Sequence, residues 1–136
     1  MDLSYADLRK ANLSQANLSR ADLKEANLHG AKLTGAILIE TNLHRACLRG
    51  AELIRANLTE ADLREADMFG ANLVGADLTG ALLIEADLCQ TNLVEANMYE
   101  ANMYRTNLRG AKVYSEQLLK AQTIMEAIMP DGTIHE

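Results

Sequence analysis

Apolar and polar positions alternate along this chain with a period of five residues. Residues 61–80 read ADLREADMFGANLVGADLTG, and the same register runs without insertion through residues 1–115, giving 23 pentapeptides. The third position is Leu in 19 of them, the first is Ala in 19, and the second is Asp or Asn in 17. The fourth and fifth positions vary. An internal repeat this regular predicts a repetitive architecture for most of the chain.

A five-residue period fits neither a helix nor a straight strand. In a helix, Ala and the Leu two residues later would lie on opposite faces, and successive leucines would spiral around the axis. In a strand, Ala and Leu of one repeat share a face, but the odd period would turn the next repeat over. The pattern is consistent only if the chain turns a corner after each pentapeptide. It therefore predicts a coiled chain whose successive coils stack at the strand spacing and depend on their neighbours.

The repeat letters also predict which side chains point inward. Leu at mid-side and Ala near the corner face the interior, and the other three positions face solvent. Seven of the eight glycines occupy the fifth position, where a type II turn requires a positive φ. The Asp and Asn side chains recur too uniformly to be catalytic or metal-binding, and we expect them to bond local backbone groups at the bends.

The A-[DN]-L-x-x tandem resembles the pentapeptide-repeat proteins over about 115 of the 136 residues. This resemblance implies an all-β solenoid, a right-handed quadrilateral β-helix with four pentapeptides per coil. On that basis the repeats make about six coils, a rod roughly 28 Å long at the strand spacing.

The chain divides into a repeat domain, residues 1–115, and a C-terminal cap, residues 116–136. Ser115 is expected to be the N-cap of a short helix over residues 116–122, and Pro130 and Gly132 mark a tight turn. Apolar side chains of the cap are expected to cover the last coil: Leu118, Leu119, Ile124, Met125 and Ile128. The tail resembles the closing segments of bacterial, often cyanobacterial, family members.

The first coil has no comparable cap in the sequence. An uncapped coil exposes unpaired backbone groups that can pair with another chain. We therefore expect self-association through the N-terminal coil.

Composition and charge argue against several classes of function. The net charge of -6 argues against direct nucleic-acid binding, and no apolar run is long enough for a transmembrane helix. No signal peptide is recognisable, and two cysteines, Cys47 and Cys89, are too few for a disulfide scaffold. We expect a cytoplasmic protein without membrane contact. The three histidines lack metal-ligand spacing, and no nucleophile–base set or phosphate loop is present, so we expect no enzyme activity and no cofactor.

Two sets of outward residues are candidates for a protein-binding surface. With twenty residues per coil, the fourth position of one side carries an apolar column: Ile54, Val74, Val94 and Tyr114. The structural alternative is a ladder of β-favouring side chains without a partner. Another side carries an acidic column, Glu40, Glu60 and Glu100, which a basic partner would fit. Its structural alternative is a solvated surface of mixed charge.

The favoured hypothesis is a non-enzymatic, rigid rod that presents its faces to a protein partner. The alternative is a DNA-mimicking regulator or protector of DNA gyrase, because some pentapeptide-repeat proteins resemble duplex DNA in shape and charge. A mimic of this length would need about 16 negative charges, far more than this rod carries. An ice-binding surface would need a flat threonine array, and Thr34, Thr59 and Thr79 are too scattered.

Overall fold

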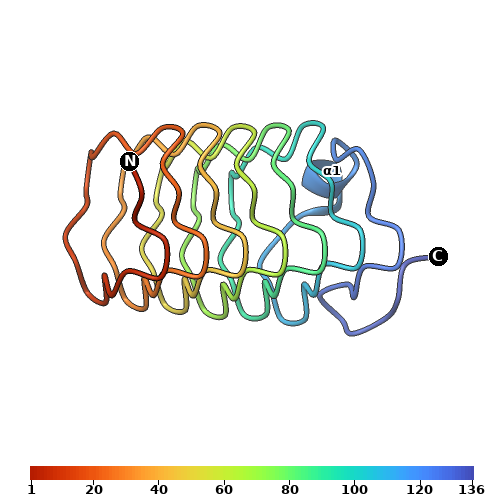
Figure 1. Cartoon of the computed structure of the whole chain (residues 1–136). Helices are drawn as coiled ribbons and strands as arrows, with labels where there is room; N and C mark the ends of the chain where they lie inside the picture. The colour runs from red at the N-terminus through yellow and green to blue at the C-terminus, as the bar shows by residue number, and fades with distance from the viewer.

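The computed structural model describes residues 1–136 as a stack of coils running from the N-terminal to the C-terminal end (Figure 1). The second residue of each repeat forms a parallel β-bridge with the residue twenty positions on, from Asp2↔Asp22 through to Asn92↔Lys112. One lap of the chain therefore takes four pentapeptides, and the lap length implied by the family resemblance is confirmed. The bridges are single residues, so no continuous strand forms, and the only helix is α1, Ser115–Leu118.

Each pentapeptide uses its backbone in the same way. The amide of Leu73 donates to the carbonyl of Asn92 in the next coil at 2.8 Å, and the amide of Asn72 donates to the carbonyl of Ala51 in the previous coil at 2.9 Å. The corner closes when the amide of Ala76 donates to the carbonyl of Leu73 at 3.0 Å. Coil-to-coil bonds and corner bonds together satisfy most of the main chain.

The fifth position has a positive φ in every regular repeat. The seven glycines predicted there have φ between 63° and 69°, as expected. The same conformation is also adopted at this position by non-glycine residues such as Glu25 (φ 54°), Arg55 (φ 54°) and Glu95 (φ 62°). The turn geometry thus imposes the left-handed conformation whichever residue is present, and glycine only relieves its strain.

The interior is a continuous column of Leu, Met and Ala. One cluster of 36 buried residues runs from Leu18 to Leu118. Thr41, Thr91 and Thr106 replace Ala at the corner and are also buried, and each hydroxyl donates to a main-chain carbonyl at 2.7–2.8 Å. The core is therefore solid and fully satisfied.

The Asp and Asn side chains have the structural role expected for them. Asn72 Oδ1 accepts the amide of Val74 at 3.2 Å, and Asp77 Oδ1 accepts the amide of Thr79 at 3.0 Å. The same bond recurs in repeat after repeat. In repeats with Asp or Asn at the second position, it satisfies the fourth-position amide, which neither the coil-to-coil bonds nor the corner bond uses.

The helix differs from the sequence expectation. Its N-cap is Tyr114, not Ser115, and α1 ends at Leu118 instead of continuing to residue 122. The side chain of Gln117 holds it in place: Oε1 accepts the amide of Tyr114 at 2.8 Å, and Nε2 donates to the carbonyls of Leu93 and Ala96 at 2.7 and 2.9 Å. Gln117 thereby substitutes for coil-to-coil bonds on the side where α1 replaces a pentapeptide.

The chain returns to the coil after α1, shifted by one residue. Thr123 pairs with Asn102, and Ile128 with Asn107, at a spacing of 21 residues. The tail then folds back, and Ile128 forms an antiparallel bridge with Ile134. The predicted turn is confirmed, because Gly132 has φ 87° and its amide donates to the carbonyl of Met129 at 2.8 Å.

The expected covering of the last coil is right in part. Leu118 is buried, and Ile124 packs partly buried against the core. Leu119 and Met125 do not cover the coil, because they are 81% and 55% exposed. The short helix and the one-residue shift turn these two side chains outward.

Candidate interaction surfaces

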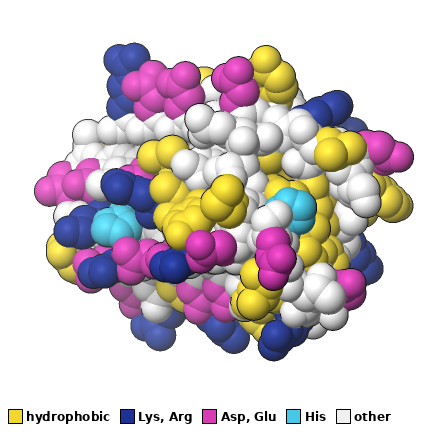
Figure 2. All heavy atoms as spheres, turned by 90° about the vertical axis from the view of Figure 1, so that its right-hand side faces the viewer, with side chains coloured by type: hydrophobic (Ala, Val, Ile, Leu, Met, Phe, Trp, Pro, Cys, Tyr) yellow, Lys and Arg dark blue, Asp and Glu magenta, His cyan; other side chains and the backbone are white.

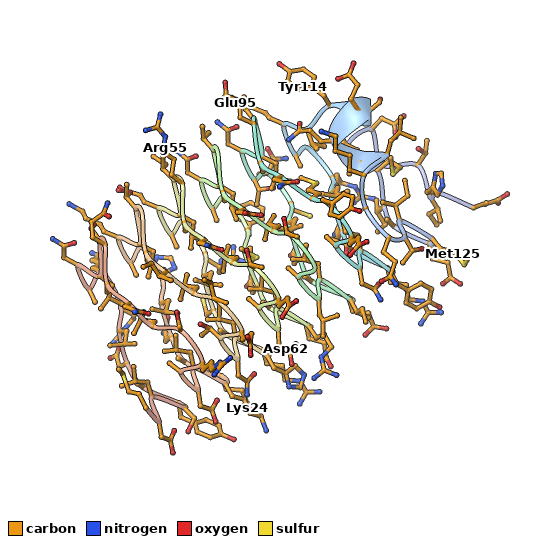
Figure 3. The ribbon with its side chains drawn as sticks, turned by 90° about the horizontal axis from the view of Figure 1, so that it is seen from above. Lys24, Arg55, Asp62, Glu95, Tyr114 and Met125 are labelled. Carbon is orange, nitrogen blue, oxygen red and sulfur yellow. The ribbon has the colours of Figure 1, made fainter.

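The structure places the apolar column in one line along the rod. The amide of Arg55 donates to the carbonyl of Val74, and that of Gly75 to the carbonyl of Val94, both at 2.9 Å. Ile54, Val74 and Val94 are half-buried, and Tyr114 is exposed. Figure 3 shows Arg55, Glu95 and Tyr114 along one border of the rod, with Lys24 and Asp62 on the opposite border. The column thus ends at the aromatic side chain that precedes α1.

The acidic column is stacked as expected but is partly neutralised. The amide of Glu40 donates to the carbonyl of Thr59, and the amide of Glu60 to that of Thr79, so these repeats stack directly. Arg20 bonds both carboxylate oxygens of Glu40 at 3.2 Å. Glu60 and Glu100 form no ion pair. This column belongs to the side that follows the apolar column along the chain, so the two sets do not form one patch.

Several other acidic side chains of the rod are paired across coils. Glu65 accepts from Arg45 at 2.9 Å and lies 3.4 Å from the His44 ring, and these contacts hold its pKa below the usual value. Arg105 lies between Glu85 and Glu126, at 3.5 and 2.6 Å. Pairs twenty residues apart are a consequence of the lap length. They mean that the surface of the rod presents a field of mixed charge rather than a continuous negative field.

The metal-ligating and thiol side chains of the rod are dispersed. No group of three or more His, Cys, Asp or Glu side chains is placed to hold a metal ion. Cys47 and Cys89 are free thiols. Burial raises the pKa of Cys89 to about 11, helped by its bond to Asp87, which makes this thiol a poor nucleophile. None of the helical structure is long and apolar enough to cross a membrane.

The surface at the C-terminal end was not expected from the sequence. Exposed apolar side chains gather there: Tyr99, Tyr114, Leu119, Met125 and Ile134. Figure 2 views this end and shows hydrophobic side chains beside a histidine, with charged side chains both among them and toward the rim. Only the apolar content of residues 118–128 signals this surface in the sequence, and that content is equally typical of a closed cap.

The N-terminal end is less buried than the body. Leu3, Leu8 and Leu13 pack on the core but are less deeply buried than Leu23 and Leu28, which are fully buried. The self-association expected of this coil stays a prediction.

Comparison with known proteins identifies the repeat. The family model for pentapeptide repeats matches eight copies over residues 2–38, 36–73 and 71–110. The chain belongs to the pentapeptide-repeat family. Proteins of this family are generally structural or interaction modules rather than enzymes. No curated protein matches the chain.

Several solved structures of pentapeptide-repeat proteins are similar to this chain. HetL, a pentapeptide-repeat protein involved in heterocyst differentiation regulation from Nostoc sp. strain PCC 7120, is 29% identical, with a TM-score of 0.59 over 98% of this chain and 85% of HetL. Rfr23 from Cyanothece 51142 is 36% identical, with a TM-score of 0.63, over 66% of this chain and 59% of Rfr23. A pentapeptide-repeat protein of the Arabidopsis thaliana thylakoid lumen is 24% identical, with a TM-score of 0.60 over 98% and 82%, and shows the shared fold.

Proposed function

We propose that this pentapeptide-repeat protein is a right-handed quadrilateral β-helix that acts as a rigid, non-enzymatic rod and binds a protein partner through its outward columns. The observation that supports this most is the distribution of roles within each repeat. The first three positions of a repeat have structural roles. Ala71 and Leu73 are buried in the core, and Asn72 bonds to the neighbouring coil and, through its side chain, to the bend. Only the fourth and fifth positions remain free to carry specificity.

The apolar column is the proposed contact. Val74 and Val94 are half-buried on a side of the rod whose outward positions outside this column are polar or glycine, and Tyr114 adds an exposed ring at its end. A rigid rod loses little conformational entropy on binding, so a modest apolar strip supports specific association. The acidic column, with Glu60 and Glu100 unpaired, lies on another side and would contact a basic part of the same partner.

The experiment is an affinity capture from the native organism with matched variants. Val74→Lys with Val94→Lys should lose a partner that the unchanged protein retains, because two charges then interrupt the apolar column. The control carries Ile84→Lys and Tyr104→Lys, which also occupy half-buried fourth positions one coil apart, but on a side that carries neither proposed column. Loss of the partner in both variants, or in neither, contradicts the proposal.

Gyrase protection is the less supported alternative. The pairing of Glu40, Glu65 and Glu85 with arginines reduces the negative field that a DNA mimic needs. A supercoiling assay of gyrase with and without the protein, in the presence of a quinolone, tests it directly. Unchanged inhibition excludes this function.

A cytoplasmic location in a cyanobacterium is also part of the proposal. It is supported by the two unpaired thiols, Cys47 and Cys89, and by the cyanobacterial origin of HetL and Rfr23.

A further inference from the structure

The C-terminal end of the rod leaves bridge positions open at Lys112 and at Thr123, and an apolar hollow lies beside Thr123. Two sides of the last coil are covered: α1 lies over one, and the tail lies over another, where the amide of Glu126 donates to the carbonyl of His135 at 2.8 Å and the amide of His135 to that of Ala127 at 2.9 Å. At Thr123, between them, nothing covers the coil. The amide of Ile124 donates to no protein acceptor, and the carbonyl of Gln122 accepts from no protein donor.

These two groups match the pair that joins coils inside the rod. Asn92 bridges to Lys112 because the carbonyl of Thr91 accepts the amide of Lys112 and the amide of Leu93 donates to the carbonyl of Lys112, both at 2.9 Å. Gln122 and Ile124 flank Thr123 as Thr91 and Leu93 flank Asn92. An extended residue laid beside Thr123 would find the same acceptor and donor, as in strand addition to an open edge.

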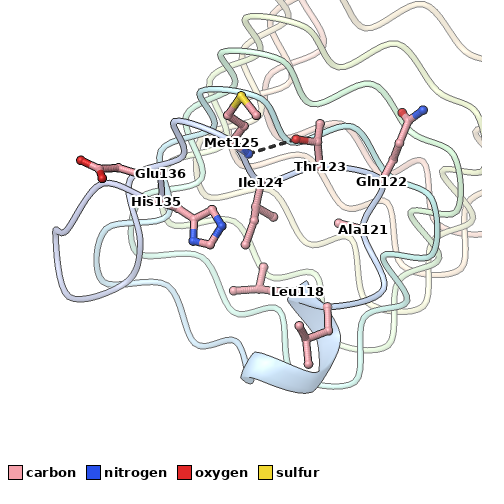
Figure 4. A pocket seen from close by; sticks show the side chains of 9 residues that line it. Leu118, Ala121, Gln122, Thr123, Ile124, Met125, His135 and Glu136 are labelled. Carbon is pink, nitrogen blue, oxygen red and sulfur yellow. Dashed lines mark hydrogen bonds between the residues drawn. The ribbon is translucent and has the colours of Figure 1, made fainter.

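The hollow beside Thr123 supplies an apolar contact for such a residue's neighbours. It has a volume of about 310 Å³ and is lined by Leu118, Leu119, Ala121, Ile124 and Met125, together with Gln122, Thr123, His135 and Glu136 (Figure 4). Leu119 is 81% and Met125 55% exposed, compared with 36% for Ile37 and 39% for Phe69 in the body of the rod. Alternate side chains of an extended segment would point into this hollow.

The charge of the hollow indicates the kind of segment. Its lining includes the carboxylate of Glu136 and no lysine or arginine. Glu136 forms no ion pair. A lysine or arginine of an incoming segment would therefore be attracted to this carboxylate.

We propose that the open bridge position at Thr123 and the adjoining hollow bind an extended, basic segment of a partner protein, with apolar side chains alternating with lysine or arginine. The amide of its central residue donates to the carbonyl of Gln122, and the carbonyl of that residue accepts from the amide of Ile124. The site lies at the end of the rod and is independent of the apolar column along its side.

Defined peptides test the site on the full-length protein. Short fluorescent peptides alternate Leu with Lys, Ser or Glu, and a fourth Leu–Lys peptide carries an N-methyl group at its central residue. Fluorescence anisotropy should show the Lys peptide binding most tightly, with the N-methyl version weaker by about fivefold or more because it cannot donate to Gln122. Exchange of the Ile124 amide with solvent should slow when the Lys peptide is added.

Matched variants distinguish this site from the rest of the rod's surface. Leu119→Ser should weaken binding of the Lys peptide, and Ile37→Ser, an exposed apolar residue elsewhere on the rod, should not. The Val74→Lys, Val94→Lys variant should bind the peptide normally, so the outcome is separable from that of the proposed side contact. No binding, equal binding of the Lys and Glu peptides, or an unaffected N-methyl peptide overturns the proposal. Self-association of the protein that Leu119→Ser abolishes also overturns it, because the occupant is then a second copy.

Discussion

The Leu73 side chain is buried, and its amide donates at 2.8 Å to the carbonyl of Asn92 in the next coil, while the neighbouring Val74 side chain reaches the surface. Of these two adjacent residues, Leu73 thus belongs to the core and Val74 to the surface. Leu73→Ala should lower the free energy of unfolding by about 2–5 kcal/mol, because it leaves a cavity in the core column. Val74→Ala should cost much less. Urea denaturation of both variants measures the difference, and equal costs would refute the inward assignment of Leu73.

At the left-handed fifth position, replacing a glycine should lower the stability of the fold, and introducing a glycine should raise it. Gly70 has φ 68°, and the space that a Cβ would occupy there is open, so Gly70→Ala should cost about 1 kcal/mol from backbone strain alone. Glu95 has φ 62° and forms no ion pair, so Glu95→Gly should stabilise the fold.

Glu95→Gln is the control, since it removes the charge and keeps the strain. The shift of the denaturation midpoint of each variant distinguishes the two causes. A stabilisation by Glu95→Gln equal to that of Glu95→Gly would attribute the gain to charge, not to φ.

Gln117 is expected to be the most sensitive residue of α1. Its Nε2 donates to the carbonyls of Leu93 and Ala96, and its Oε1 accepts from Tyr114. Gln117→Glu replaces the donor with an acceptor facing two carbonyls, so it should cost about 1–3 kcal/mol at neutral pH. Because a protonated carboxyl can donate, the cost should shrink on acidification relative to the unchanged protein. Thermal unfolding across pH measures this, and a pH-independent cost would contradict the proposed bonds.

Asp7 offers a pH test of a surface pair. Hydrogen bonds from Arg9 lower the pKa of Asp7 from 3.8 to about 2. The folded-state pKa is depressed, so the stabilisation by the pair is complete above pH 3.8 and is lost as the pH falls through about 2. In Arg9→Gln the pKa of Asp7 should rise toward 3.8. Titration of the Asp7 carboxyl by NMR measures it, and an unchanged pKa would show that Arg9 is not the cause.

The periodic residues made most of the architecture predictable from the sequence. Leu at mid-side, Ala at the corner and Gly at the fifth position each indicate where a side chain points, and Asn72 bonds the bend as expected. The lap of twenty residues followed from the family resemblance, and from it followed the stacking of Val74 under Val94.

The C-terminal end was not predictable in the same way. Once the repeat stops at Ser115, no period indicates that the chain slips by one residue and pairs Thr123 with Asn102. Two of the three bonds of Gln117 join positions more than twenty residues apart, and local sequence contains no signal for them. The outward exposure of Leu119 follows from the short helix and that slip, which is why a closed cap was expected and an open end is found.

The central claim is that the outward columns determine binding specificity, whereas the regularly recurring positions of each repeat only maintain the fold. Its most direct measurement is the dissociation constant of the captured partner for the Val74→Lys, Val94→Lys variant and for the Ile84→Lys, Tyr104→Lys control, with both variants shown to be folded by circular dichroism. We predict that the first variant binds at least about tenfold more weakly than the unchanged protein, a loss of about 1.4 kcal/mol or more, and that the control binds as the unchanged protein does. Equal dissociation constants for the two variants would contradict the claim.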